Sequence, residues 1–327
     1  MARTRTGEWS ATAMPEMDDR TVVVTGANSG LGYEATRAFA RKGAHVVMAC
    51  RSDERGEDAK RRIRNEETRG GHRGSLEVAE LDLADLDSVR SFADEFRETH
   101  DELHVLCNNA GVMAIPRRET ADGFEMQFGV NHLGHFALTG LLLEPLRETP
   151  GETRVVTQSS GVHERGDIDF ADLQHEQSYD EWEAYAQSKL ANVLFAYELQ
   201  RRLDAASADA GVASVACHPG YAATNLQRRG PEMRGSTVRL WAMKAANALL
   251  AQSAEDGALP MLYAATAPEI EGGEYVGPGG LLNMRGSPAV QQSSDSSYDR
   301  ARAERLWSVS EESTGVSYGL EAKTTAE

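Results

Sequence analysis

Short apolar runs alternate with longer amphipathic segments along this chain. The runs, such as the one at residues 20–25, have the length and composition of buried strands in a parallel sheet. The longer segments have helical spacing; in residues 84–100, Val89, Phe92 and Phe96 fall on one face. The pattern predicts strands at residues 20–25, 44–50, 75–81, 103–107, 153–159, 212–217 and 275–276. It predicts helices at residues 33–42, 51–69, 84–100, 122–147 and 181–206.

This alternation predicts an α/β fold: a single doubly wound Rossmann-type domain with a mostly parallel seven-stranded sheet. There is no internal repeat and no clear linker, so we assign the domain to residues 20–319. A lead-in at residues 1–19 precedes it, and a frayed tail at residues 320–327 follows it. Residues 225–256 stand outside the alternation as mixed helix and loop, and the polar residues 286–297 are expected to form a loop.

The charge balance narrows the classes of partner. The 327 residues include 34 Lys and Arg against 51 Asp and Glu, a net charge of −17, which argues against nucleic-acid binding. The basic residues are nearly all arginine. An acidic, lysine-poor surface indicates a halophilic protein from a high-salt cytoplasm, whereas a GC-rich genome would explain the arginines alone.

We expect neither a membrane span nor a secretory signal in this sequence. No run approaches the roughly 18 apolar residues of a membrane span, and residues 1–20 lack the apolar core of a secretory signal. We therefore expect a cytoplasmic protein without a membrane span. Cys50, Cys107 and Cys217 each end a strand-like run, which favours buried thiols over disulfides or a zinc site.

A glycine-rich turn joins the first predicted strand to the first predicted helix. Gly26, Gly30 and Gly32 let the backbone turn tightly and let a ligand approach, and Asn28 and Ser29 add polar donors. Backbone N–H groups and the helix dipole point at one spot there, which suits a phosphate group. The spacing differs from the usual G-x-G-x-x-G fingerprint, so an ordinary tight turn is the alternative.

Tyr185 and Lys189 lie four residues apart in a predicted helix. That spacing puts both side chains on one face, about 6 Å apart along the axis. A phenol has a pKa near 10, and a neighbouring ammonium group lowers it, which would suit the tyrosine to acid/base chemistry. An exposed helical pair without chemistry is the alternative.

Several motifs occur in an order that resembles the short-chain dehydrogenase/reductase family, and its retinol-dehydrogenase-like branch in particular. The likeness extends from about residue 20 to residue 318. Residues 49–51, 130–136 and 275–278 carry the likeness to the branch. The family motifs fall on Gly26, Gly30, Leu31, Gly32, Asp82, Leu83, Asn109, Ala110, Gly111, Asn131, Ser160, Tyr185, Lys189, Pro219 and Gly220.

The resemblance implies a role for each catalytic residue. Tyr185 would be the general acid/base, and Lys189 would lower its pKa and hold the nicotinamide ribose. Ser160 would bind the substrate oxygen, and Asn131 would help to hold a proton-relay water. The gap of 25 residues between Ser160 and Tyr185 is wider than usual in the family, because an insert there contains Asp167, Asp169, His175 and Trp182.

The resemblance also implies cofactor contacts. Asp82 would contact the adenine, Asn109 would lie close to the cofactor, and Thr224 would contact the nicotinamide amide. The preference between cofactors depends on the end of the second strand, where Cys50 brings no carboxylate and the Arg51 guanidinium can bind a phosphate. We expect NADP to be preferred, with NAD still accepted.

The function predicted is hydride transfer between NADP(H) and an alcohol/carbonyl pair. A lid formed by residues 225–256 would favour a bulky, apolar substrate. Its apolar residues are Leu226, Met233, Leu240, Trp241 and Met243. The alternatives are a carbon–carbon double-bond reductase and a non-catalytic NADP-binding regulatory protein. Proteins of this family are often homodimers or homotetramers.

Four histidines have less specific interpretations. His132 and His135 are three residues apart on a helix, but no third ligand is near them in the sequence, so we expect no metal site there. His163 and His218 are alternative bases, although loop packing and hydrogen bonding at a strand end suit them better.

Overall fold

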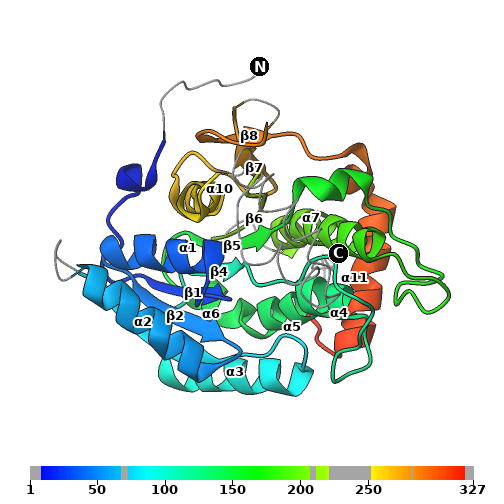
Figure 1. The fold of residues 1–327 in the computed structure, drawn as a ribbon, viewed down its shortest axis with the longest axis horizontal. Helices are drawn as coiled ribbons and strands as arrows, with labels where there is room; N and C mark the ends of the chain where they lie inside the picture. The colour runs from blue at the N-terminus through cyan, green and yellow to red at the C-terminus, as the bar shows by residue number, and fades with distance from the viewer. Residues whose placement is uncertain (1–8, 68–72, 207–210, 221–251, 281–282, 321–327) are drawn as a thin grey trace, which may run out of the picture.

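The computed structural model describes residues 9–67, 73–206, 211–220, 252–280 and 283–320. In this part of the chain, eight strands form one sheet in the order β3-β2-β1-β4-β5-β6-β7-β8 (Figure 1). Strands β1 to β7 are parallel, and β8 is antiparallel to β7. The strands are β1 (Thr21–Thr25), β2 (His45–Cys50), β3 (Ser75–Glu80), β4 (Val105–Asn108), β5 (Thr153–Gln158), β6 (Val212–Cys217), β7 (Tyr275–Pro278) and β8 (Pro288–Gln291).

Helices cover both faces of the sheet, because alternate residues of each buried strand point in opposite directions. Val22 and Val24 of β1 pack in one core, and Val23 packs in the other. The first face carries α1 (Gly30–Arg41), α2 (Asp53–Glu67) and α10 (Ala254–Thr266). The second carries α3 (Leu86–Thr99), α5 (Gly134–Leu141), α6 (Leu143–Glu148) and α7 (Glu181–Ala206), with α11 (Arg300–Thr314) packed against α7 and α5.

The doubly wound fold predicted from the sequence is confirmed, but its strand count of seven is wrong. Strand β8 lies within residues 286–297, which were expected to form a loop. It is four residues long, with Val290 47% exposed, and it joins the sheet through backbone pairing to β7 rather than through an apolar pattern. Helix α11 and most of α10 were not assigned from the sequence either.

The single helix predicted at residues 122–147 is also wrong, because four pieces stand there. Residues 126–128 form a short helix, α4 (Met126–Phe128), and the chain then widens into a π-helical turn, η2 (Gly129–Leu133), before α5 and α6. Glu125 caps the start: its carboxylate accepts hydrogen bonds from the backbone N–H groups of Gln127 and Phe128. The helix therefore begins four residues later than predicted.

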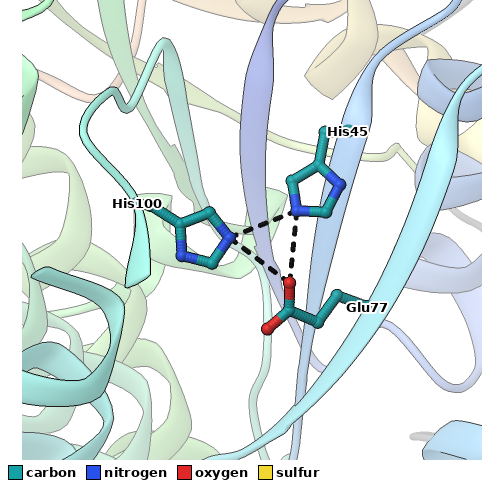
Figure 2. Close-up of side chains that lie close together, drawn as sticks. All are labelled: His45, Glu77 and His100. Carbon is teal, nitrogen blue, oxygen red and sulfur yellow. Dashed lines mark hydrogen bonds and ion pairs between the residues drawn. The ribbon is translucent and has the colours of Figure 1, made fainter. Parts of the chain in front are cut away.

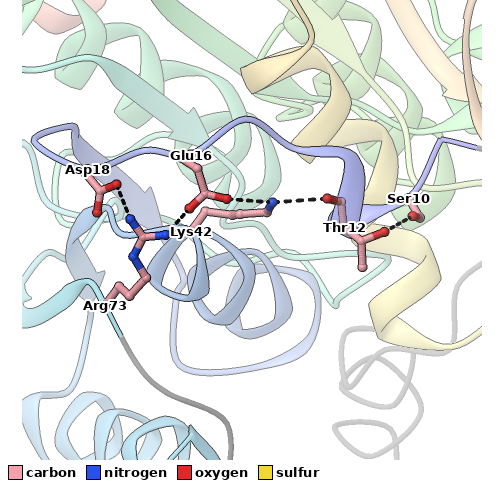
Figure 3. Close-up of polar contacts among 6 residues, drawn as sticks. All are labelled: Ser10, Thr12, Glu16, Asp18, Lys42 and Arg73. Atoms are coloured by element: carbon pink, nitrogen blue, oxygen red, sulfur yellow. Dashed lines mark hydrogen bonds and ion pairs between the residues drawn. The ribbon is translucent and has the colours of Figure 1, made fainter.

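Both ends of the described chain pack against the domain. In the lead-in, Met14 and Met17 are buried, and Lys42 and Arg73 hold Glu16 in ion pairs of 3.4 and 2.5 Å (Figure 3). At the other end, Leu320 is buried in the core, so the prediction that the frayed tail begins at residue 320 is wrong.

Other predicted segments lie outside the described residues. They are residues 321–327 of the tail, Thr224 and residues 225–251 of the expected lid. None of the described helices is both long and apolar enough to cross a membrane.

Candidate active site

The glycine turn lies at the carboxyl end of β1. Gly26 and Gly30 adopt left-handed conformations, with φ of +67° and +58°, which disfavour any other residue. A Cβ atom on Gly32 would lie 2.5 Å from the Gly26 carbonyl oxygen, so this glycine lets α1 pack closely. Helix α1 begins at Gly30, earlier than the predicted residue 33, and the Ser29 side chain does not cap it. The first-turn N–H groups can therefore bind an anion.

Thr25 connects the glycine turn to the turn after β4. Its hydroxyl oxygen accepts hydrogen bonds from the backbone N–H groups of Asn109 and Ala110, each at 2.9 Å. The Asn109 side-chain amide in turn donates to the Thr25 carbonyl oxygen at 2.8 Å. The Asn109 side chain thus joins the glycine turn to the turn after β4.

The two turns line one pocket. Most of the predicted cofactor-binding residues are among its walls, together with Ala49, Ser52, Arg55, Met126 and Val130, which the sequence analysis missed. The predicted residues in the walls are Gly26, Asn28, Ser29, Gly30, Leu31, Arg51, Asp82, Leu83, Asn109, Ala110 and Gly111. Arg55 had a detectable signal, since it follows Arg51 by four residues at the start of a predicted helix.

Pro219 and Gly220 follow β6 and are not among the walls of this pocket. Gln252 donates a hydrogen bond to the Pro219 carbonyl oxygen, and Gly220 has a φ of +63° beside Met284. Thr224, expected to contact the nicotinamide, lies outside the described residues. The structure therefore gives these residues no contact that tests their predicted role.

Ser160, Tyr185 and Lys189 meet beyond the carboxyl end of β5. Ser160 ends the loop after β5 and caps the short helix η3 (Gly161–Arg165), while Tyr185 and Lys189 are buried on α7. The Lys189 Nζ atom donates to the Gln158 carbonyl oxygen at 3.1 Å and lies 5.8 Å from the centre of the Tyr185 ring. The predicted i,i+4 pair is therefore buried, not an exposed helical pair.

The pKa of Tyr185 differs from the sequence expectation. Burial raises it to about 12, and a hydrogen bond with Ser160 is what opposes the rise. Burial also lowers the pKa of Lys189 to about 8. The predicted lowering by Lys189 is therefore wrong for this arrangement, because the ammonium group is directed at the Gln158 carbonyl oxygen and desolvation dominates.

Asn131 lies in the π turn and joins α7 to the turn after β4. Its side-chain oxygen accepts from the Val112 N–H at 2.8 Å, and its amide donates to the Val112 carbonyl oxygen and the Ser188 hydroxyl, both at 2.9 Å. A Cβ atom on Gly111 would lie 2.8 Å from the Asn131 Oδ1 atom and 3.6 Å from the Lys189 Nζ atom. Asn131, Gly111 and Lys189 therefore meet at the edge of the pocket.

His135 continues this network beneath the pocket. Its Nδ1 atom lies 3.1 Å from the Asn131 carbonyl oxygen, and its Nε2 atom lies 2.9 Å from the Thr25 hydroxyl. Burial lowers the pKa of His135 to about 4, so the ring is neutral at pH 7. A neutral ring donates from Nδ1 to the carbonyl and accepts at Nε2 from Thr25, which links the glycine turn to Asn131.

The other three histidines singled out in the sequence, His132, His163 and His218, have structural partners. His132 lies 2.9 Å from the Ser310 hydroxyl of α11, and burial lowers its pKa to about 3. His163 follows Ser160 in the loop and receives a hydrogen bond from the Ser294 N–H, while His218 contacts Gln291 of β8. His163 thus joins the segment after β5 to the segment that follows β8, and His218 joins the end of β6 to β8, as loop packing and strand-end bonding would require.

The insert between Ser160 and Tyr185 places one large aromatic side chain beside the tyrosine. Trp182 is 50% exposed, and its ring meets the Tyr185 ring edge-on at 6.2 Å between centroids. Asp167 pairs with Arg302 of α11 at 2.5 Å. An exposed indole next to a buried phenol offers an apolar surface to a ligand that reaches Tyr185.

Comparisons with known proteins show which proteins this chain is similar to. A family model described as short chain dehydrogenase matches residues 20–235. Retinol dehydrogenase 14 of Mus musculus is 40% identical over 312 residues, covering 92% of this chain and 87% of that protein. Polyprenol dehydrogenase of Homo sapiens is 38% identical over 309 residues, again covering 92% and 87%.

A solved structure extends the likeness to three dimensions. An uncharacterized protein from Mycobacterium Paratuberculosis is 42% identical and matches with a TM-score of 0.77. The match covers 95% of this chain and 99% of that one.

Proposed function

The chain belongs to the short-chain dehydrogenase family, and from its site we propose that it transfers a hydride between NADP(H) and an alcohol/carbonyl pair. The observation that carries this proposal is the arrangement of the partly exposed Ser160 with the buried Tyr185 and Lys189 beside the glycine-lined pocket. Membership of the family makes the protein an oxidoreductase that uses a nicotinamide cofactor. The choice of NADP and the nature of the substrate are our proposals.

The residues present suit a dinucleotide. The left-handed Gly26 and Gly30 and the uncapped start of α1 form a cradle that side chains at these positions would fill or strain. At the adenosine end, position 50 is a buried cysteine and not an Asp or Glu, so this position does not repel a 2′-phosphate. Arg51 and Arg55 both line the pocket, and their two guanidinium groups can bind that phosphate. Arg55 supplies a second positive charge that the glycine turn lacks.

The chain's own part in the reaction is proton transfer. NADP(H) carries the hydride when bound. Tyr185 is protonated at neutral pH and can donate its proton to a carbonyl oxygen, while the Ser160 hydroxyl, which acts to lower the pKa of Tyr185, can hold that oxygen in reach. Burial lowers the pKa of Lys189 to about 8, so this side chain can exchange a proton near neutral pH. In alcohol oxidation, the same residues would act in the reverse direction.

We propose that the substrate is bulky and apolar. The half-exposed Trp182 lies edge-on to Tyr185, so a large apolar group bound at the tyrosine would cover the indole. The relatives named above are a retinol and a polyprenol dehydrogenase, and both names specify long apolar alcohols. This support is independent of the expected lid at residues 225–251, which lie outside the described residues.

A substrate panel tests the proposal. Purified protein is given NADPH or NADH with long apolar aldehydes, small polar aldehydes and enones, and cofactor oxidation is followed by absorbance. We expect the highest kcat/KM with NADPH and the apolar aldehydes. Consumption of NADPH with enones alone would replace the proposal with double-bond reduction, and equal kcat/KM for small and large aldehydes would remove the apolar substrate class.

A further inference from the structure

Away from the pocket, at the amino ends of β2 and β3, three potential metal ligands face one another (Figure 2). The group consists of His45, the first residue of β2, Glu77 of β3 and His100, which directly follows α3. Cys50 ends β2 at the adenosine side of the pocket, so the length of the strand separates the group from that pocket by about 16 Å.

The fold brings these residues together through strand register. In the parallel pairing of β2 with β3, His45 lies opposite Ser75, and Val47 lies opposite Glu77. Side chains two residues apart share a face, so His45 and Glu77 are on the face where Val47 packs against α3. Helix α3 packs on that same face, and His100 at its end completes the group.

The spacing of the three ligand atoms fits a tetrahedral metal. The His45 Nε2 and His100 Nε2 atoms are 3.2 Å apart, and each lies 3.3 Å from the Glu77 Oε2 atom. Zinc bonds of 2.0–2.1 Å in tetrahedral geometry place neighbouring ligand atoms about 3.3–3.4 Å apart. The three distances therefore match one face of such a tetrahedron, with a fourth position left for water.

On the far side of each ring, the Nδ1 atom has a hydroxyl partner, and for His100 this partner fixes the tautomer. The Thr99 hydroxyl donates its proton to the Glu95 carbonyl oxygen at 2.7 Å, so at 2.9 Å it can only accept from the His100 Nδ1 atom. The neutral His100 ring therefore carries its proton on Nδ1 and presents a free lone pair at Nε2. The His45 Nδ1 atom has a hydroxyl partner as well, Ser75, at 2.6 Å.

We propose that His45, Glu77 and His100 bind a divalent transition metal of the zinc type. Two imidazoles and one carboxylate are ligands that zinc favours, and the acidic chain attracts a cation. The His45 and Glu77 side chains are 31% and 44% exposed, so the ion has an entry path and the fourth ligand is solvent. The bound ion would join β2, β3 and the end of α3, and so would stabilise the folded state.

Zinc titration of the full-length chain tests the site directly. Untagged protein is stripped with a chelator, dialysed and titrated with ZnCl₂ in a calorimeter. We expect one equivalent to bind in the wild type, and His100→Gln or Glu77→Gln to weaken binding at least tenfold. Glu80→Gln is the matched control, because Glu80 is an exposed carboxylate on the same strand outside the group, and its affinity for zinc should equal that of the wild type.

Two further readouts separate this site from surface binding. Zinc should raise the midpoint of thermal unfolding of the wild type and of Glu80→Gln but not that of His100→Gln, since an ion that binds only the folded state stabilises it. Cobalt should give the visible absorption of a tetrahedral complex in the wild type and in Glu80→Gln but not in His100→Gln. Absence of stoichiometric zinc binding in the wild type, or equal affinity in both His100→Gln and Glu77→Gln, would overturn the proposal.

Discussion

At the carboxyl end of β1, Thr25 and His135 are shielded from water, whereas at the amino ends of β2 and β3, His45 and Glu77 remain partly exposed. Both ends hold histidines within hydrogen-bonding distance of other polar groups. Burial lowers the pKa of His135 to about 4, so it accepts no proton near neutral pH and serves as a fixed hydrogen-bonding group. At the exposed end, the nitrogens of His45 and His100 face a carboxylate within reach of solvent and its ions.

The difference shows how one scaffold separates two kinds of polar chemistry. Between the ends, β1 and β2 are apolar and buried, and they separate the two groups of polar residues. The carboxyl end is enclosed by the glycine turn, the π turn and α7, where dehydration is the main cause of the pKa shifts of His135, Tyr185 and Lys189. Four measurements, taken from the largest expected effect to the smallest, would break or sharpen this contrast.

Tyr185→Phe should break the chemistry of the buried end. Loss of an acid/base group lowers kcat by about 10²–10⁴-fold, while the glycine pocket and its cofactor affinity stay nearly intact. The measurement is kcat with NADPH affinity on the same samples. Tyr263→Phe is the control, because its hydroxyl contacts Glu269 at the surface and its kcat should match the wild type. A near-normal kcat in Tyr185→Phe would refute the assignment.

Acid should destabilise the fold because His132 is buried and neutral. The pKa of His132 is about 3 in the folded state and about 6.5 when unfolded, so below pH 6.5 only the unfolded state gains the proton. This contribution to stability is complete above pH 6.5 and is lost as the pH falls toward 3, at up to about 1.4 kcal/mol per pH unit.

The test compares how steeply the free energy of unfolding changes with pH, rather than the free energy at one pH. Chemical unfolding is followed from pH 7 to pH 4.5 in the wild type, in His132→Phe and in His45→Asn, with a chelator present. The free energy of unfolding of His132→Phe should fall less steeply with decreasing pH than that of the wild type. The difference in slope should be about 1.4 kcal/mol per pH unit, the value for one proton. His45→Asn should change the slope less, because His45 is partly exposed. Parallel curves for wild type and His132→Phe would contradict the argument.

Cofactor preference should respond to the rim of the pocket. Arg51→Ala and Arg55→Ala should each weaken NADPH binding by about tenfold and leave NADH binding unchanged. Tenfold is the lower end of the effect expected for a charge-assisted hydrogen bond at a solvated site. Cys50→Asp should reverse the preference by repelling the 2′-phosphate. Arg97→Ala, on α3 and paired with Asp94, is the charge-matched control. An unchanged ratio of the two kcat/KM values in Arg51→Ala and Arg55→Ala would disprove the assignment.

Salt should act on the exposed surface far more than on the buried end. Repulsion in a chain of net charge −17 extends about 10 Å in 0.1 M salt and about 3 Å in 1 M salt. The midpoint of thermal unfolding should therefore rise by a few degrees between 0.1 and 1 M KCl. A flat or falling midpoint would instead favour a GC-rich genome as the source of the arginines.

The sequence was most informative where short-range rules apply. The glycine turn, the strands of the parallel sheet and the Tyr185/Lys189 pair were predictable because each depends on spacing within a few residues. Helix α7 was found at its observed bounds for the same reason. The spacing of Ala303, Leu306 and Trp307 is helical as well, and it indicates the buried face of α11.

Other features depend on contacts between distant parts of the chain. Strand β8 exists through its pairing with β7, and the high pKa of Tyr185 arises from the elements that bury it. The meeting of His45, Glu77 and His100 requires two strands in register and the end of a helix. None of these has a local signature, which is why a sequence pattern did not disclose them.

The π turn makes this part of the chain sensitive to length rather than only to residue identity. A π turn accommodates one residue more than a regular helix, and each residue of a helix turns the next by about 100°. A single deletion between residues 129 and 133 would therefore rotate His135 away from Thr25 even if every remaining residue were unchanged. Across homologous sequences, we expect gaps to be rarer in this segment than substitutions at its individual positions.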